Sequence, residues 1–258
     1  MKFVLKQPTV FKDILSVMTE LITEGTLICD ADGIKFRAMD NANVAMIILN
    51  INKALFDEYI VKDTESLAMN FNNLKGIFRK INADDIMTFE TESSKVKIVF
   101  AGKTKRTFHQ PIIEAGEDPN KNKEPNIQYT MRITMPSGLF SESIEDAGIS
   151  GDSVDFITEP GMFHMVAEGD NSKAQVDIAQ DEKLGVVVTL LDKTDAGKKI
   201  EYKAKFSLEY LKKMMVGSKL AENISIRYGK DIPVALEFSK ENVYKLGYYL
   251  APRIDSSD

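Results

Sequence analysis

Residues 33–56 read GIKFRAMDNANVAMIILNINKALF, and this stretch decides how the chain is interpreted. Apolar and polar residues alternate on either side of the polar segment 40–43 (DNAN), which predicts two antiparallel strands joined by a turn. Residues 161–178, GMFHMVAEGDNSKAQVDI, have the same layout around a turn at 169–171. A helical pattern precedes each copy. A chain built twice on one plan is typically a scaffold whose function is spread over a surface.

The composition is that of a globular protein, because 43% of the 258 residues are apolar and 28% are charged. This length suffices for one large domain or two of ordinary size. The longest apolar runs, such as 44–49, are too short to span a bilayer, and no basic-then-apolar leader opens the chain. We therefore expect neither a membrane association nor export.

The formal net charge of −6 makes the chain as a whole a poor binder of nucleic acid. Any DNA contact must therefore come from local basic patches. Cys29 is the single cysteine, and it follows an apolar run, so we expect a small core residue rather than a nucleophile. One thiol permits no internal disulfide, which agrees with a reducing cytosol.

Four segments carry the 3.6-residue periodicity of amphipathic helices, and they begin at nearly even intervals along the chain. They are residues 10–23, 73–81, 138–147 and 208–216. We expect Thr9 to cap the start of the first, Gly25 to close it, and Asn72 to cap the second. Runs of period-two alternation lie between them, at 86–90, 95–100, 154–157, 185–190, 224–228 and 234–238. The pattern predicts an α+β fold, in which one helix followed by antiparallel strands is used four times, twice in each of two domains.

A boundary between the domains is visible at residues 114–126, EAGEDPNKNKEPN, which lack apolar periodicity and are rich in Pro, Asn and charge. We expect an amino-terminal domain at 1–113, an exposed connector at 114–126 and a carboxyl-terminal domain at 127–258, opened by a strand at 127–134.

No catalytic, cofactor or metal motif is complete in the sequence. The GKT at 102–104 lacks the earlier glycine of a phosphate-binding loop, since position 97 is Lys97. The calcium-loop rhythm that starts at Asp118 has Lys123 where Gly is needed. His109 and His164 have no cysteine or paired histidine around them, so we expect structural roles in strands. We expect no enzyme activity, no cofactor and no metal.

The polar faces of the helices are more informative. The second and fourth segments expose cations, the first contributes Lys12, and the third is acidic, with Glu142, Glu145 and Asp146. The charged face of a single helix is usually only exposed to solvent and binds no ligand. Cations on equivalent helices of both halves of an acidic protein indicate a positive surface suited to a polyanion. Near the carboxyl end, residues 245–252, KLGYYLAP, are either core or part of an exposed apolar pocket of the kind that binds proteins.

Three ordered landmarks then resemble one known family. They are the pattern of residues 33–56, the MPSG at 135–138 followed by Phe140, and the YLAPR at 249–253. Together they resemble the sliding clamps of the proliferating cell nuclear antigen (PCNA) family, of archaeal type, over essentially the whole chain.

The resemblance implies a trimeric ring around duplex DNA, with helices lining the hole and sheets outside, bound without regard to base sequence. Such a ring acts as a processivity factor in DNA replication and repair, and a clamp loader opens and closes it. It tethers DNA polymerase, flap endonuclease and ligase through short peptide motifs and has no catalytic activity. The resemblance places the protein in the cytoplasm with the nucleoid if archaeal, or in the nucleus if eukaryotic.

The resemblance also assigns residues to three surfaces. The DNA-facing cations are Lys12, Lys75, Arg79, Lys80, Lys212, Lys213 and Lys219. The pocket for partner peptides comprises Met39, Asn43, Val44, Met46, Ile127, Pro233, Tyr249, Leu250, Ala251 and Pro252. Subunits are expected to pair edge strands at about 105–112 and 174–178, through Thr107, Phe108, His109, Ala174, Val176 and Ile178. The acidic third helix departs from the basic pattern expected around the hole.

Two other hypotheses remain open from the sequence. One is an interaction scaffold of the same fold with another task, such as a checkpoint-type clamp or one subunit of a heterotrimer. The other is an enzyme with a dispersed acidic site, such as a nuclease, which the missing metal and nucleophile motifs disfavour.

Overall fold

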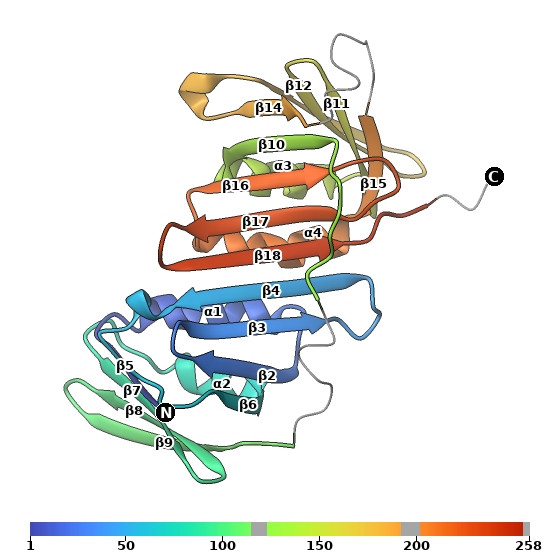
Figure 1. The fold of residues 1–258 in the computed structure, drawn as a ribbon. Helices are drawn as coiled ribbons and strands as arrows, with labels where there is room; N and C mark the ends of the chain where they lie inside the picture. Colours follow the sequence, from blue (N-terminus) through green and yellow to red (C-terminus); the bar gives the residue numbers. More distant parts are fainter. Residues whose placement is uncertain (115–122, 192–201, 255–258) are drawn as a thin grey trace. The chain divides into compact units, whose positions relative to one another are not determined.

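A computed structural model describes residues 1–114, 123–191 and 202–254 of the chain (Figure 1). The chain forms two compact units. The first comprises Met1–Glu124 with Ser239–Leu246, and the second comprises Pro125–Phe238 with Gly247–Asp258. Residues 115–122 of the predicted connector lie outside the described residues.

The first unit runs in the order strand, helix, three strands, 3₁₀ turn, two strands, helix, three strands. Its elements are β1 (Lys2–Leu5), α1 (Thr9–Thr19), β2 (Glu24–Asp30), β3 (Gly33–Met39), β4 (Ala45–Asn52), η1 (Lys53–Leu55), β5 (Glu58–Ile60), β6 (Glu65–Asn70), α2 (Phe71–Phe78), β7 (Ile86–Glu92), β8 (Lys95–Ala101) and β9 (Lys105–Pro111).

The second half of the chain repeats this order and adds a 3₁₀ turn, η4, after its second helix. Its elements are β10 (Met131–Pro136), α3 (Ser137–Ala147), β11 (Ser153–Glu159), β12 (Met162–Glu168), β13 (Lys173–Ala179), η2 (Glu182–Leu184), β14 (Val187–Leu190), β15 (Tyr202–Ser207), α4 (Leu208–Met214), η4 (Met215–Lys219), β16 (Asn223–Tyr228), β17 (Val234–Lys240) and β18 (Tyr244–Leu250). The sequence prediction of an α+β fold with one plan used twice is confirmed.

The strands pair in corresponding orders in the two units. The first unit has β5-β1-β7-β8-β9 and β4-β3-β2-β6, and the second has β14-β10-β16-β17-β18 and β13-β12-β11-β15. Every printed register is antiparallel, as the short turns between successive strands require. Figure 1 shows α1 and α2 on one face of the strands of the first unit, and α3 and α4 on one face of those of the second.

The predicted hairpin at residues 33–51 is confirmed, and Asp40 explains its turn. Its buried carboxylate accepts hydrogen bonds from the backbone N–H groups of Ala42 (3.2 Å), Val44 (2.9 Å) and Ala45 (2.8 Å). Asn43 adopts a φ of 58°, which asparagine tolerates better than most residues. The turn thus supplies its own backbone hydrogen bonds and fixes Met39 opposite Met46.

Gly33, which opens the hairpin, is required by close backbone approach. Its φ is +148°, and a Cβ atom there would lie 1.9 Å from the carbonyl oxygen of Ile51. In the second unit, the turn between β12 and β13 depends on Gly169, where a Cβ atom would lie 2.3 Å from the carbonyl oxygen of Ser150. Both turns therefore need the glycine that the sequence provides.

Aromatic side chains fill both cores between helices and strands. In the first unit, Phe3 stacks on Phe89 with a 4.6 Å separation of ring centroids, and Phe11 of α1 contacts Phe78 of α2 at 5.5 Å. In the second unit, Phe156 is surrounded by the rings of Phe140, Phe163, Phe206 and Tyr228. Burying each such ring stabilises the fold by about 1.5–3 kcal/mol, and each ring pair adds roughly 1 kcal/mol.

Cys29 is fully buried in β2, as predicted. Burial, with a smaller contribution from Glu65, raises the pKa of its thiol to about 12. The thiol therefore remains protonated at neutral pH and behaves as a core side chain.

Three local predictions about helix ends were wrong. Gly25 does not close α1 but lies in β2, where a Cβ atom would lie 2.7 Å from the ring of Phe36. The cap of α2 is Asn70, whose side chain accepts from the Asn73 N–H at 3.1 Å, not Asn72, since the helix begins at Phe71. Thr9 is the first residue of α1 and follows Pro8.

The segment boundaries also differ in places. The strand predicted at 127–134 begins only at Met131, because residues 131–136 are the ones that pair with β16. The helix predicted at 208–216 ends at Met214 and continues as the 3₁₀ turn η4. The other strand runs lie within one or two residues of the observed strands, which is the usual uncertainty of element ends.

A buried ion pair ties the start of β9 to the loop before β7. The carboxylate of Asp85 is 1% exposed, accepts from the Asn82 N–H at 2.7 Å, and pairs with the guanidinium of Arg106. Burial opposes ionisation of this carboxyl, but the Asn82 N–H and the Arg106 guanidinium outweigh it, so its pKa is lowered. Arg106 also lies over the ring of Phe100, 5.5 Å from its centroid.

We predict that Asp85→Asn lowers the free energy of unfolding at pH 7 by about 2–4 kcal/mol, because it leaves the half-buried guanidinium of Arg106 without its charge partner. Since the folded-state pKa of Asp85 is lowered, its stabilisation is present above its unfolded pKa and is lost as pH falls through the folded value. Urea unfolding at pH 7 and pH 3 measures both effects. The variant should lose less stability on acidification than the wild type, and Asp84→Asn, an exposed neighbour, is the control. Equal acid sensitivity of wild type and Asp85→Asn would contradict the assignment.

Candidate nucleic-acid interface and partner surfaces

The predicted DNA-facing cations of the first unit lie on the polar sides of α1 and α2. The two helices pack on each other, and their apolar sides carry Phe11, Ile14, Leu74 and Phe78, all buried. The opposite sides are thereby left facing solvent. Lys12 and Lys75 are half-buried there, while Arg79 and Lys80, at and beyond the carboxyl end of α2, are exposed.

Lys75 is held by a carboxylate from the other helix. Its ammonium Nζ lies 3.0 Å from Oε1 of Glu20, the residue that follows α1. Among the described residues, Lys12, Arg79 and Lys80 have no acidic partner within 4.0 Å. Of the four cations assigned to these two helices, Lys75 is therefore neutralised and the other three have no ion pair with a described residue.

The second unit presents Lys212 and Lys213 on α4 and Lys219 at the end of η4. Lys212 pairs across to Glu145 of α3 at 3.6 Å, and Lys213 pairs with Glu209 of its own helix at 2.6 Å. Lys219 is exposed and has no ion pair in the described part of the chain. The hydrogen bond and charge of Lys213 lower the pKa of Glu209.

The acidic residues predicted on the third helix are exposed, as expected for its polar side. Glu142, Glu145 and Asp146 all face solvent on α3, and Glu145 is the one with a cation within 4.0 Å in the described structure. The polar sides of α3 and α4 therefore carry a negative excess, because Glu142, Glu145, Asp146 and Glu209 outnumber the lysines there even with Lys219 of η4 included, whereas those of α1 and α2 carry a positive excess.

The residues predicted for the peptide pocket are divided between the two units. In the first unit, Met39, Val44 and Met46 are half-buried around the turn that Asp40 organises, and Asn43 is exposed at its tip. The hairpin brings these four residues together. Flexible methionine side chains on a partly exposed surface adapt to varied apolar ligands.

The remaining predicted pocket residues are in the second unit and differ in exposure. Ile127, Pro233, Ala251 and Pro252 are half-buried, whereas Tyr249 is 7% and Leu250 is 1% exposed. Leu250 is thus a core residue in the structure, and a charge placed there would test folding rather than binding.

The predicted subunit-contact residues lie on strands at the ends of their sheets. Thr107, Phe108 and His109 belong to β9, which pairs with β8 and ends its sheet. Ala174, Val176 and Ile178 belong to β13, which pairs with β12 and ends another. Both strands have seven residues with alternating exposure. Long edge strands expose unpaired N–H and C=O groups and readily accept another strand.

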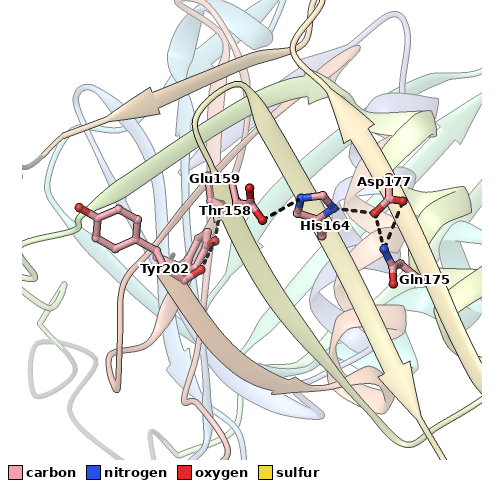
Figure 2. A network of polar contacts seen from close by, with 7 residues as sticks. Thr158, Glu159, His164, Gln175, Asp177 and Tyr202 are labelled. Carbon is pink, nitrogen blue, oxygen red and sulfur yellow. Dashed lines mark hydrogen bonds and ion pairs between the residues drawn. The ribbon is translucent and has the colours of Figure 1, made fainter. Parts of the chain in front are cut away.

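A network of polar contacts joins side chains of β13 to those of β12 and β11 (Figure 2). Nδ1 of His164, on β12, lies 2.6 Å from Oδ1 of Asp177, and the amide of Gln175 donates to the same oxygen at 2.9 Å. On the other side of the ring, Nε2 of His164 lies 3.9 Å from Glu159. The hydrogen bonds from His164 and then Gln175 lower the pKa of Asp177.

The same figure shows a second group of contacts near Thr158 and Tyr202. The Tyr228 hydroxyl hydrogen-bonds with Thr158 and donates to the carbonyl of Tyr202 at 3.2 Å. Burial raises the pKa of Tyr228, so this hydroxyl stays protonated. Both groups of contacts link different strands of the second unit.

Sequence reasoning missed Glu20, Glu145 and Glu209 as partners of the basic residues. The i,i+4 spacing of Glu209 and Lys213 was available in the sequence as a signal. The pairs between helices carry no sequence signal, because only the packing of α1 on α2 and α3 on α4 brings their residues together.

Within residues 1–114, 123–191 and 202–254, no group of three or more His, Cys, Asp or Glu side chains is arranged to hold a metal ion. In the same residues no helix is long and apolar enough to cross a membrane.

Comparison with known families fits this architecture. The family description "Proliferating cell nuclear antigen, N-terminal domain" matches residues 1–112, and "Proliferating cell nuclear antigen, C-terminal domain" matches residues 123–253. The chain belongs to the PCNA family. The resemblance seen in the sequence is confirmed.

Curated relatives and solved structures agree. The chain is 28% identical over 247 residues to the DNA polymerase sliding clamp of Thermococcus onnurineus, covering 95% of each chain. It is 29% identical over 248 residues to that of Nanoarchaeum equitans, covering 95% of this chain and 96% of the relative. PCNA from Thermococcus kodakaraensis has the same fold, with a TM-score of 0.87 at 21% identity over 98% of this chain and 99% of the other. A chain in the PCNA2–PCNA3 complex from Sulfolobus tokodaii matches with a TM-score of 0.86 at 24% identity and the same coverage.

Proposed function

We propose that the chain is the subunit of a DNA polymerase sliding clamp, a ring that encircles duplex DNA and tethers replication and repair enzymes to it. The observation that carries the proposal is the repeated unit, in which two helices turn their polar sides to solvent on the same face. The relatives named DNA polymerase sliding clamp support it, because they match along nearly their whole length. Cations on those helices suit a phosphate backbone bound without reading bases.

The edge strands supply a means of closing the ring. Pairing β9 of one copy with β13 of the next would satisfy the backbone groups of two seven-residue edges. Each copy then contributes one strand of each kind, so the contact is head-to-tail and generates a ring when the rotation closes. We propose three copies, with 1–113 and 127–258 as the domains and 114–126 as the connector.

A hetero-oligomer is the second candidate. It is favoured by the likeness to a chain in a complex of two different PCNA proteins. The same edge strands would then pair with a related chain rather than with an identical one.

The proposed partners are proteins that carry a short motif with aliphatic and aromatic side chains, among them DNA polymerase, the clamp loader, flap endonuclease and ligase. The proposed receiving residues are the half-buried methionines around the Asp40 turn in the first unit and the half-buried Ala251 and Pro252 in the second. The clamp acts as a scaffold without catalysis of its own.

The first prediction from the proposed function concerns assembly. Pure chain should have about three times the 28.9 kDa mass of one subunit by light scattering, and Val176→Asp should reduce it to the monomer, because a charge is placed on an apolar edge. Val187→Asp places the same charge on exposed edge strand β14 and should leave the trimer intact. A wild-type monomer would reject the homotrimer and favour the second candidate.

The second prediction concerns the peptide pocket. Met46→Glu should weaken binding of a fluorescent partner peptide at least tenfold, measured by anisotropy, because a carboxylate is placed where an apolar side chain docks. Met162→Glu, at a half-buried methionine that opens β12, is the matched control. Unchanged affinity for Met46→Glu would show that the peptide binds elsewhere.

The third prediction concerns the DNA face. Lys12→Glu with Arg79→Glu should weaken binding to linear duplex and make the slope of log affinity against log salt less negative by about 0.9 for each lost phosphate contact. Lys62→Glu with Lys183→Glu makes the same charge change at exposed positions away from the helices. If both double variants lose the same affinity, the effect belongs to net charge and the assigned face is wrong.

A further inference from the structure

The two units place one lysine at the same position of their second helices. α2 begins at Phe71 after the cap Asn70, and α4 begins at Leu208 after Ser207. Lys75 and Lys212 are each the fifth residue of their helix. Both are half-buried on the polar side, next to the first helix of the same unit.

Each of these lysines is paired with a carboxylate contributed by that neighbouring helix. Lys75 Nζ lies 3.0 Å from Glu20, with side chains 26% and 33% exposed. Lys212 Nζ lies 3.6 Å from Glu145, with side chains 36% and 64% exposed. The same ion pair between helices thus occurs once in each unit.

The two carboxylates reach the lysines from different positions. Glu20 immediately follows α1, and its counterpart, counted from the start of α3, is Gly148. A Cβ atom at Gly148 would lie 2.2 Å from Lys212 Nζ, so the ammonium occupies the space where a side chain there would begin. Glu145, one turn earlier, provides the carboxylate instead. The units therefore share the pair although the acidic residue differs in position.

These two ion pairs add little to the stability of the folded protein. Partly exposed ion pairs contribute little to the free energy of folding, because water and salt screen them. On a surface that faces a polyanion, the same pairs have a larger effect on binding. A lysine engaged with a carboxylate must give up that contact to meet a phosphate, and the carboxylate left behind repels the same phosphate.

Lys213 is likewise paired, with Glu209 of its own helix at 2.6 Å, but the remaining cations assigned to these surfaces lack such competition. In the described residues, Lys12, Arg79, Lys80 and Lys219 have no acidic side chain within 4.0 Å. The helix surfaces therefore contain two classes of cation, those available to phosphate and those held by an internal carboxylate.

We propose that Glu20 and Glu145 set how tightly the protein holds DNA, by competing with phosphate for Lys75 and Lys212. This inference rests on the proposed clamp function and assigns it two positioning residues. While Lys75 and Lys212 are paired with these carboxylates, they do not contact the phosphates of the DNA backbone. The contacts stay weak and exchangeable, which a protein that moves along DNA requires.

The test uses the isosteric change Glu20→Gln with Glu145→Gln in the full-length protein and a fluorescein-labelled linear duplex. Releasing both lysines should tighten binding several-fold at low salt. It should also steepen the slope of log affinity against log salt by up to about 0.9 per lysine that reaches a phosphate. Diffusion of the labelled variant along stretched DNA should be slower than that of the wild type.

Two controls separate the pairs from net charge. Glu142→Gln with Asp146→Asn removes the same charge from exposed α3 positions that have no cation within 4.0 Å in the described structure. It should change affinity and slope less than the test variant. Adding Lys75→Gln and Lys212→Gln to the test variant should abolish the gain, and thermal melting checks that each variant is folded.

The outcomes distinguish failure of the proposed competition from failure of the proposed clamp function. If the wild type binds duplex and the test variant binds with equal affinity and slope, the competition by Glu20 and Glu145 is rejected and the clamp function stands. An equal gain for the Glu142 and Asp146 control also rejects it. If wild type, test variant and controls all fail to bind duplex, the proposed clamp function itself is rejected.

Discussion

The packing of two helices against the same strands is the constraint on which the rest of each unit depends. α1 and α2 in the first unit, and α3 and α4 in the second, bury apolar sides that include Phe11, Phe78, Phe140 and Leu211. An amphipathic helix that buries one side must expose the other, so the polar sides of each pair lie together. That arrangement brings Lys75 to Glu20 and Lys212 to Glu145. The electrostatics of the candidate DNA face thus follow from core packing.

The repeated plan also explains how one hairpin serves two purposes. β3–β4 and β12–β13 occupy corresponding places in the two units, but only the second turn contains a glycine, Gly169, that close backbone approach requires. In the first unit the turn is organised by Asp40 and presents apolar side chains. In the second, β13 ends its sheet, and its Asp177 is bonded to His164 of the neighbouring strand β12. The two hairpins share the same strand layout, but their exposed residues differ.

Much of the fold was predictable, because periodicity and turn chemistry are local properties. The four helices, most strands, the buried Cys29 and the DNAN turn follow from spacing within short windows. Errors arose where the packing of strands outweighed local preference. Gly25 was predicted as a helix end but packs against Phe36, and Leu250 was placed in a pocket but is 1% exposed. Burial of this kind cannot be read from residue spacing.

The sequence by itself determined the twofold plan, the PCNA family and which helices carry cations, because these depend on residue types and their spacing. The tertiary structure alone decided which cations are neutralised. Glu20 and Lys75 are 55 residues apart, and their 3.0 Å contact exists only because α1 packs on α2. It likewise decided that β9 and β13 end their sheets, since strand order is set by pairing across the whole unit. Charge and periodicity are local, whereas pairing and neutralisation depend on how distant segments meet.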